Sequence, residues 1–155
     1  MVRMSALRNL PVICENKRLG LLQSISLDPA QKRVSALIVS CGMRGKRVVP
    51  AEDVLALADG FILSRRAVRY RRSYETPLCL FVRDTTGLLA GRVTDYAIDE
   101  ATLRVEAIEV MPGYAPSERH ARLWMFHYVH RDERPLELTI PACLGQELSE
   151  KREGI

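Results

Sequence analysis

The 155-residue sequence predicts an all-β protein built from two small β-barrels in tandem, each a rolled antiparallel sheet. Two observations lead to this prediction. One segment of the chain recurs in its second half, and short apolar runs alternate with turn signals without the periodicity of a long helix. Because units this small bury a modest share of their surface, each half is expected to depend on its sister half or on a second chain, as in a homodimer.

The repeated segment has the pattern of a β-hairpin. A glycine begins the first strand, and an aspartate opens the turn, where its side chain can bond to the backbone beyond it. The return strand is rich in apolar and β-branched residues, which favour strands. In register, the two copies match Gly20 with Gly91, Asp28 with Asp99, Arg33-Val34 with Arg104-Val105, Ala36 with Ala107, and Val39 with Val110.

The segments that follow the two hairpins differ. In the first half we expect a short strand ended by Pro50, then a turn at Asp59-Gly60 and a closing strand at 61–63. In the second half, Thr139-Ile140-Pro141 is matched to Val48-Val49-Pro50, which requires a long insertion. The predicted domains are a first repeat over 1–66 with its core at 8–64, a basic linker over 67–75, a second repeat over 76–145 with an insertion at 111–134, and a polar tail over 146–155.

Composition and charge exclude few classes of protein. The net charge of +4, from 23 basic and 19 acidic side chains, permits contact with nucleic acid or anionic lipid without requiring it. The apolar runs are too short for a membrane span, and no signal peptide is recognised, so we expect a cytoplasmic protein. No CxxC pair occurs among the four cysteines, which are Cys14, Cys41, Cys79 and Cys143. We therefore expect them to be small buried hydrophobes, and the alternative is that they form disulfides or bind a metal.

An ordered series of landmarks in residues 8–64 resembles the PRC-barrel family. The landmarks are Leu10-Pro11, Arg18-Leu19-Gly20, Asp28, Arg33 to Val39, and Arg47 to Val54. Residues 76–145 are similar through their central hairpin. The family includes the cytoplasmic domain of the photosynthetic reaction-centre H subunit and the C-terminal domain of a ribosome maturation factor. The resemblance implies a stand-alone bacterial adaptor that binds proteins or RNA–protein particles and has no catalytic residues.

The junction between the halves carries the best nucleic-acid signal in the sequence. Its arginines can grip phosphates and its tyrosines can stack on bases, although a solvated linker or a strand with a wet basic face has the same pattern. An acidic protein or lipid surface is a further candidate partner. The residues are Arg65, Arg66, Arg69, Tyr70, Arg71, Arg72 and Tyr74.

A second candidate surface lies in the predicted insertion. The aromatic residues Trp124 and Phe126 either belong to the core or form an exposed patch that binds a partner. His127 and His130 would share a metal on a helix, but a strand would place them on opposite faces. We therefore predict no metal, no cofactor and no catalytic residue, and we expect a non-enzymatic adaptor. The alternatives are an RNA- or ribosome-associated factor using the arginines, and a barrel that binds a small ligand or metal.

Overall fold

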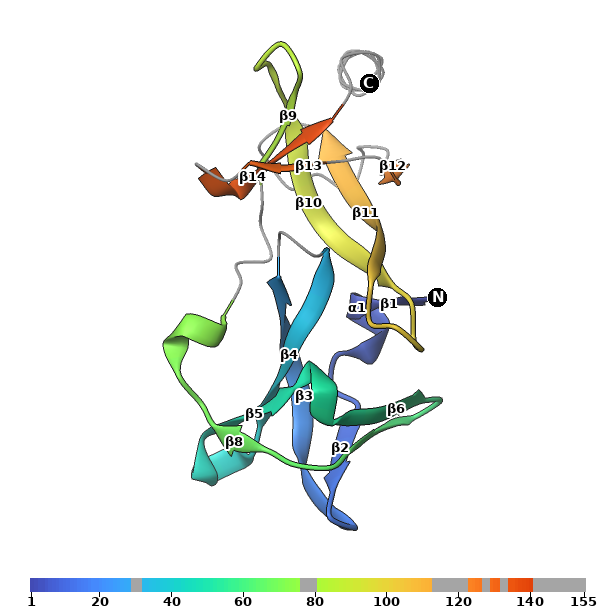
Figure 1. Cartoon of the computed structure of the whole chain (residues 1–155), viewed down its shortest axis with the longest axis vertical. Coiled ribbons are helices and arrows are strands. Elements are labelled where there is room, and N and C mark those ends of the chain that lie inside the picture. Colours follow the sequence, from blue (N-terminus) through green and yellow to red (C-terminus); the bar gives the residue numbers. More distant parts are fainter. Residues whose placement is uncertain (29–31, 76–80, 113–122, 127–128, 132–133, 141–155) are drawn as a thin grey trace. The chain divides into compact units, whose positions relative to one another are not determined.

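The computed structural model describes residues 1–28, 32–75, 81–112, 123–126, 129–131 and 134–140 (Figure 1). The chain forms two compact units. The first comprises Met1–Thr76 together with Ile98–Val105, and the second comprises Pro77–Ala97 and Glu106–Ile155. Strands dominate the described residues, which confirms the all-β prediction. Among these residues, no helix is both long enough and apolar enough to cross a membrane.

The first unit contains a curled sheet whose strands lie in the order β6-β7-β2-β3-β4-β5-β8. β2 runs parallel to β7, and every other neighbouring pair in this order is antiparallel. The strands are β2 (Pro11–Cys14), β3 (Lys17–Asp28), β4 (Arg33–Ser40), β5 (Lys46–Pro50), β6 (Val54–Ala58), β7 (Phe61–Ser64) and β8 (Val68–Arg69). The short elements are β1 (Val2–Arg3), α1 (Met4–Leu7) and the 3-10 turns η1 (Gly42–Arg44), η2 (Ala51–Asp53) and η3 (Arg72–Tyr74).

The predicted hairpin is formed by β3 and β4, which pair from Leu21 opposite Ser40 to Asp28 opposite Arg33. Residues 36–39 are all buried, although successive side chains of a strand point to opposite faces. This part of the sheet is therefore covered on both faces. That arrangement explains why the return strand is continuously apolar instead of alternating with polar residues.

Gly20 is required where β3 passes β4. A Cβ atom at this position would lie 2.1 Å from the carbonyl oxygen of Ser40, which is a backbone atom that cannot swing aside. Any side chain would force the two strands apart at the start of the hairpin. This close approach, and not an unusual backbone conformation, accounts for a glycine inside a strand.

The junction 67–75 differs from the linker that the sequence predicts. It contains β8, which pairs with β5, and it belongs to the first unit. Val68, Tyr70 and Tyr74 pack against a buried cluster on one face of the sheet, formed by Ala36, Ile38 and Val48. The apolar and aromatic residues between the arginines thus attach this segment to the sheet.

The turn of the second predicted hairpin also belongs to the first unit. Arg33 and Arg104 form an antiparallel bridge, flanked by two backbone hydrogen bonds of 2.8 Å. The Val34 amide donates to the carbonyl of Leu103, and the Val105 amide donates to the carbonyl of Lys32. The Leu103 side chain is buried, and Leu103 and Lys32 both have positive φ, at 58° and 48°. Residues 98–105 are therefore an integral part of the first unit.

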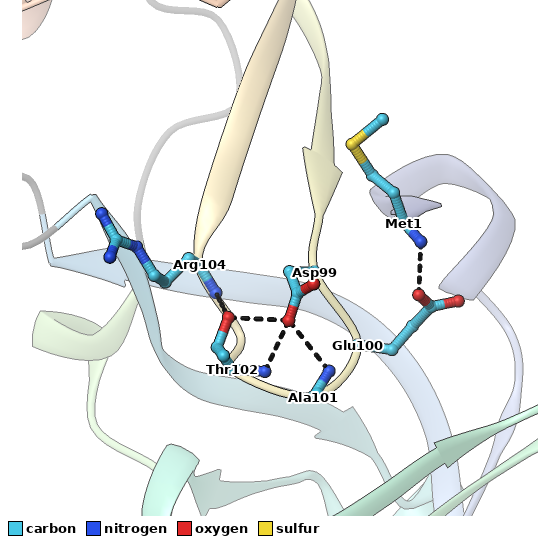
Figure 2. A network of polar contacts seen from close by, with 6 residues as sticks. All are labelled: Met1, Asp99, Glu100, Ala101, Thr102 and Arg104. Carbon is cyan, nitrogen blue, oxygen red and sulfur yellow. Dashed lines mark hydrogen bonds and ion pairs between the residues drawn. The ribbon is translucent and has the colours of Figure 1, made fainter.

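A polar network shapes this turn (Figure 2). The Asp99 carboxylate accepts hydrogen bonds from the Ala101 amide at 3.1 Å and from the amide and hydroxyl of Thr102 at 2.7 Å each. These bonds, the Thr102 hydroxyl first, hold the pKa of Asp99 below its ordinary value. The N-terminal amine of Met1 forms an ion pair with Glu100. The turn thus uses its aspartate as the sequence predicts.

The second unit contains a sheet whose strands lie in the order β12-β11-β10-β9-β14-β13. β9 runs parallel to β14, whereas β9–β10, β11–β12 and β13–β14 are antiparallel. Read in reverse, this is the order of the first sheet from β6 to β5, with β9 in the place of β2 and β14 in the place of β7. The strands are β9 (Phe81–Asp84), β10 (Leu89–Ile98), β11 (Val105–Pro112), β12 (Leu123–Met125), β13 (Val129–Arg131) and β14 (Arg134–Ile140).

This topology corrects two expectations for the second half. The match of Thr139-Ile140 to Val48-Val49 is wrong, because β14 pairs with β9 and takes the position of β7. The position of β5 is occupied by β12, in which Trp124 lies opposite Glu109. The predicted insertion at 111–134 therefore contains two strands of the sheet, β12 and β13, and is not wholly additional to it.

Candidate functional site

One end of the first sheet brings together segments that are distant in the sequence. Cys14, the last residue of β2, lies opposite Lys17 of β3 and Ser64 of β7. β4 ends and β5 begins at the same end, where Ser40 lies opposite Lys46. The loops that leave these strands surround a hollow of about 420 Å³. We call it the basic hollow; its lining residues are Cys14, Glu15, Lys17, Arg18, Leu19, Cys41, Arg44, Arg47, Arg66 and Ala67.

Positive charge dominates the basic hollow. Five of its lining side chains are cationic, and Glu15 is the single carboxylate among them. Four of the five are arginines, whose planar guanidinium groups donate several hydrogen bonds and remain charged at any physiological pH. The five cations come from the start of β3, from η1, from β5 and from the segment after β7. The fold, and not a run of basic residues, therefore creates this charged site.

Arg66 is held in place by a buried carboxylate. Its Nε donates to Asp53 Oδ2 at 3.0 Å, and the backbone amide of Arg65 donates to the carbonyl of Asp53 at 2.8 Å. The Asp53 side chain is only 8% exposed, whereas that of Arg66 is 62% exposed. One edge of the guanidinium is thus fixed while most of the group faces solvent. This contact fixes the direction in which the chain leaves β7.

The remaining cations of the basic hollow have no such partner. Within the described part of the chain, no carboxylate lies within ion-pair distance of Lys17, Arg18, Arg44 or Arg47. All four residues are exposed. Several hydrogen-bond donors are therefore free to bind a solute.

The arginine-rich junction predicted from the sequence divides into two groups of residues. Its five arginines are exposed, and Arg66 lines the basic hollow. Tyr70 and Tyr74 are half-buried against the sheet, so these rings are not the free stacking platforms that a single-stranded RNA site would use. Lys46 lies 5.1 Å from the centre of the Tyr70 ring and forms a 2.6 Å ion pair with Glu75.

The ion pair at the junction alters the ionisation of both partners. The hydrogen bond to Glu75 raises the pKa of Lys46, and the same bond lowers the pKa of Glu75. Desolvation is the main reason that the pKa of Tyr70 is raised. All three groups are therefore held in their ordinary charge states at neutral pH. Together they attach the end of the junction to β5.

The structure describes the second candidate surface in part. Met125 is buried, Trp124 is half-buried and Phe126 is 59% exposed. His130 lies on β13 opposite Leu138, whereas His127 is outside the described residues. Within the described ranges, no three histidine, cysteine or acidic residues are grouped as a metal site.

Two of the four cysteines depart from the expectation of burial. Cys14 and Cys41 are free thiols, half-buried, and both line the basic hollow. Cys79 and Cys143 lie outside the described residues. The sequence gives no sign that Cys14 and Cys41 share one site, because β3 and β4 separate the two strand ends at which they lie.

Residues 1–67 match the PRC-barrel domain family. The match covers the first sheet through β7 and every lining residue of the basic hollow, so the resemblance seen in residues 8–64 is confirmed there. The all-β PRC-barrel fold is thereby confirmed for the first sheet. No curated protein matches the chain.

Proposed function

We propose that this protein is a non-enzymatic adaptor that binds a partner protein at the β6 edge of its PRC-barrel domain. The observation that carries the proposal is the character of this edge. β6 reads Val-Leu-Ala-Leu-Ala and has no charged residue. Natural edge strands commonly carry lysine, proline or other charge to prevent pairing with another chain.

The geometry of β6 supports addition of a further strand. β6 is the last strand in the order, and among the described residues its strand pairing is with β7 alone. Leu55 is 51% exposed, and Phe61, at the start of β7, is 41% exposed. An extended segment could therefore hydrogen-bond to the outer side of β6 and cover these apolar side chains. The occupant that fits is an extended, largely uncharged segment of a partner protein.

The experiment compares two double variants of the full chain. Leu55→Lys with Ala56→Lys places charge on the exposed edge, whereas Gln23→Lys with Ser35→Lys adds the same charge at exposed positions of the central strands β3 and β4. Partners captured from source cells are purified, and their affinities are measured by calorimetry. We expect the edge variant to bind at least about tenfold more weakly, because like charges and lost apolar contact oppose docking.

Three outcomes would contradict the proposal. The first is equal affinity of the edge variant and the control. The second is a reproducible lack of any partner together with turnover of a metabolite. The third is a homodimer that light scattering detects and that the edge variant abolishes, because the occupant would then be a second copy of this chain.

RNA binding is the second candidate function, and the exposure of all five junction arginines favours it. Filter binding of RNA across a salt series would show a steep slope if these arginines contact phosphates. Changing Arg65, Arg66, Arg69, Arg71 and Arg72 together to alanine should weaken binding and flatten that slope. Unaltered RNA affinity would remove this candidate.

We also propose that the two sheets arose by tandem duplication in a cytoplasmic bacterial protein. Their equal strand order supports the duplication, as do the pairs Val12 with Gly20 and Val82 with Gly91. Gly20 and Gly91, which align in the sequence repeat, thus occupy equivalent positions in their sheets. Alignment of residues 8–64 with residues 76–145 across homologous sequences would test the duplication, and similarity confined to the hairpin in every homologue would contradict it.

A further inference from the structure

We propose that the basic hollow is a binding site for a small phosphate-bearing anion of about nucleotide size. The hollow lies at the end of the sheet where β2, β4 and β7 finish, among residues that the adaptor proposal does not use. Its volume of about 420 Å³ falls in the range of small-molecule sites.

The charge of the basic hollow favours an anionic ligand. Five cations surround one concave site that contains a single lining carboxylate, and Asp53 engages one edge of Arg66 alone. Like charges gathered in this way repel one another unless an anion enters. Lys17 and Arg18 are consecutive, exposed residues of β3, so their positive charges also repel each other. Binding of an anion would relieve the repulsion among all five groups.

The type and arrangement of the hydrogen-bond donors favour a phosphate group. Guanidinium groups match the oxygens of phosphate with two parallel hydrogen bonds, so a site with four arginines favours phosphate over a single carboxylate. Arg44, Arg47 and Arg66 come from η1, from β5 and from the segment after β7. Donors that converge from several directions suit a tetrahedral group with several oxygens.

The rest of the lining is less polar. Leu19, Ala67 and the thiols of Cys14 and Cys41 provide apolar surface between the cations. A ligand with a phosphate and a less polar portion would use both kinds of surface. A longer RNA would instead use an extended basic surface with free aromatic rings, but Tyr70 and Tyr74 pack against the sheet. The hollow therefore favours a small ligand over a polymer.

The test is calorimetric titration of the full chain with pyrophosphate, ADP and adenosine at constant ionic strength. We expect pyrophosphate and ADP to bind and adenosine to bind much more weakly. The Arg44→Ala and Arg47→Ala double variant should lower the affinity by about tenfold or more, because hydrogen bonds to charged groups are lost. The matched control is Arg71→Ala with Arg72→Ala, since both residues are exposed and outside the lining of the hollow.

A footprint of the two thiols gives an independent readout. Pyrophosphate should slow alkylation of Cys14 and Cys41 in the wild type, with each site quantified by mass spectrometry of its peptide. The protection should disappear in the Arg44→Ala and Arg47→Ala variant. Circular dichroism would verify that this variant is folded.

Several results would overturn the proposal. These are a lack of binding by both phosphates at millimolar concentration, equal losses in the two double variants, or binding without thiol protection. Binding of an RNA oligonucleotide that exceeds pyrophosphate and depends equally on Arg71 and Arg72 would also overturn it in favour of an RNA surface. Because none of these residues lies on β6, the outcome is separate from that of the adaptor proposal.

Discussion

Gly20 and Gly91 occupy corresponding positions in the two sheets, each against the backbone of the neighbouring strand. A Cβ atom would lie 2.1 Å from the Ser40 carbonyl oxygen at the first position and 2.3 Å from the Met111 carbonyl oxygen at the second. Both glycines pair with a valine of the preceding strand, Val12 and Val82. The same steric requirement therefore applies at the start of both hairpins.

Replacing either glycine by alanine should destabilise the protein. The clash is with backbone, so strands must shift, and we expect a loss of about 3 kcal/mol in the free energy of unfolding at each position. Urea denaturation would measure it. The control is Gln23→Ala at an exposed position of β3, which should change stability by less than about 0.5 kcal/mol. A Gly20→Ala variant as stable as this control would mean that the strands do not approach so closely.

Truncating Tyr70 should loosen the junction. Its ring packs with Val68 and Tyr74 on the Ala36, Ile38 and Val48 cluster, so Tyr70→Ala should cost about 2 kcal/mol of stability. Limited proteolysis should cut between 65 and 75 faster in this variant than in the wild type. The neighbouring Arg71→Ala change, at an exposed residue, should leave both measurements unaltered. Equal proteolysis of the two variants would indicate that the segment is a free linker.

Asp84 should make stability depend on pH. Its carboxylate accepts hydrogen bonds from the hydroxyl and amide of Thr86 and from the Leu88 amide, and these, the hydroxyl first, hold its pKa below the ordinary value. The stabilisation is complete above the unfolded-state pKa of about 3.9 and is lost as pH falls through the lower folded-state pKa.

Asp84→Asn should therefore be less stable than the wild type at neutral pH and nearly equal to it in strong acid. Urea titrations at a series of pH values would measure the difference. Thr86→Val removes the hydrogen bond from the Thr86 hydroxyl to Asp84. The stability of this variant should therefore depend less on pH than the stability of the wild type does. A constant difference between wild type and Asp84→Asn across the acid range would show that this carboxylate is not linked to folding.

Leu103→Ala should disturb the first unit although residue 103 belongs to the second hairpin. The buried side chain supports the bridge in which the Val34 amide donates to the Leu103 carbonyl. We expect a loss of about 2 kcal/mol and faster hydrogen exchange at the amides of Val34 and Val105. Thr102→Ala, which removes an exposed hydroxyl from the turn, should have a smaller effect on these two amides. Unchanged exchange at Val34 would contradict the assignment of this turn to the first unit.

Local patterns in the sequence predicted the first sheet well. The β3–β4 hairpin, the strand that Pro50 ends and the turn at Asp59-Gly60 all lie where turn residues and apolar runs place them. The second sheet was harder to predict because β12 has only three residues and follows a segment unlike the first half. The topology of this sheet depends on which strands pair. No local pattern in residues 123–140 indicates that β12 pairs with β11 and that β14 pairs with β9.

The candidate site could be predicted only in part. A run of arginines is visible in the sequence, and it led to Arg66. The other cations of the hollow are single residues in separate segments, such as Arg44 and Arg47, which no run or spacing marks. The sequence alone suggests that the tyrosines of the junction are stacking groups. Their burial against β4 and β5 depends on tertiary structure, which the local sequence does not reveal.

The bridge between Arg33 and Arg104 has a consequence for biosynthesis. Residues 98–105 complete the first unit, so its last contacts cannot form until residue 105 has left the ribosome. By then β9 and β10 of the second sheet have also emerged, while β14, the parallel partner of β9, has not yet emerged from the ribosome. The nascent chain therefore holds an incomplete second sheet when the first one closes, and a chaperone would find its exposed strand edges at that stage.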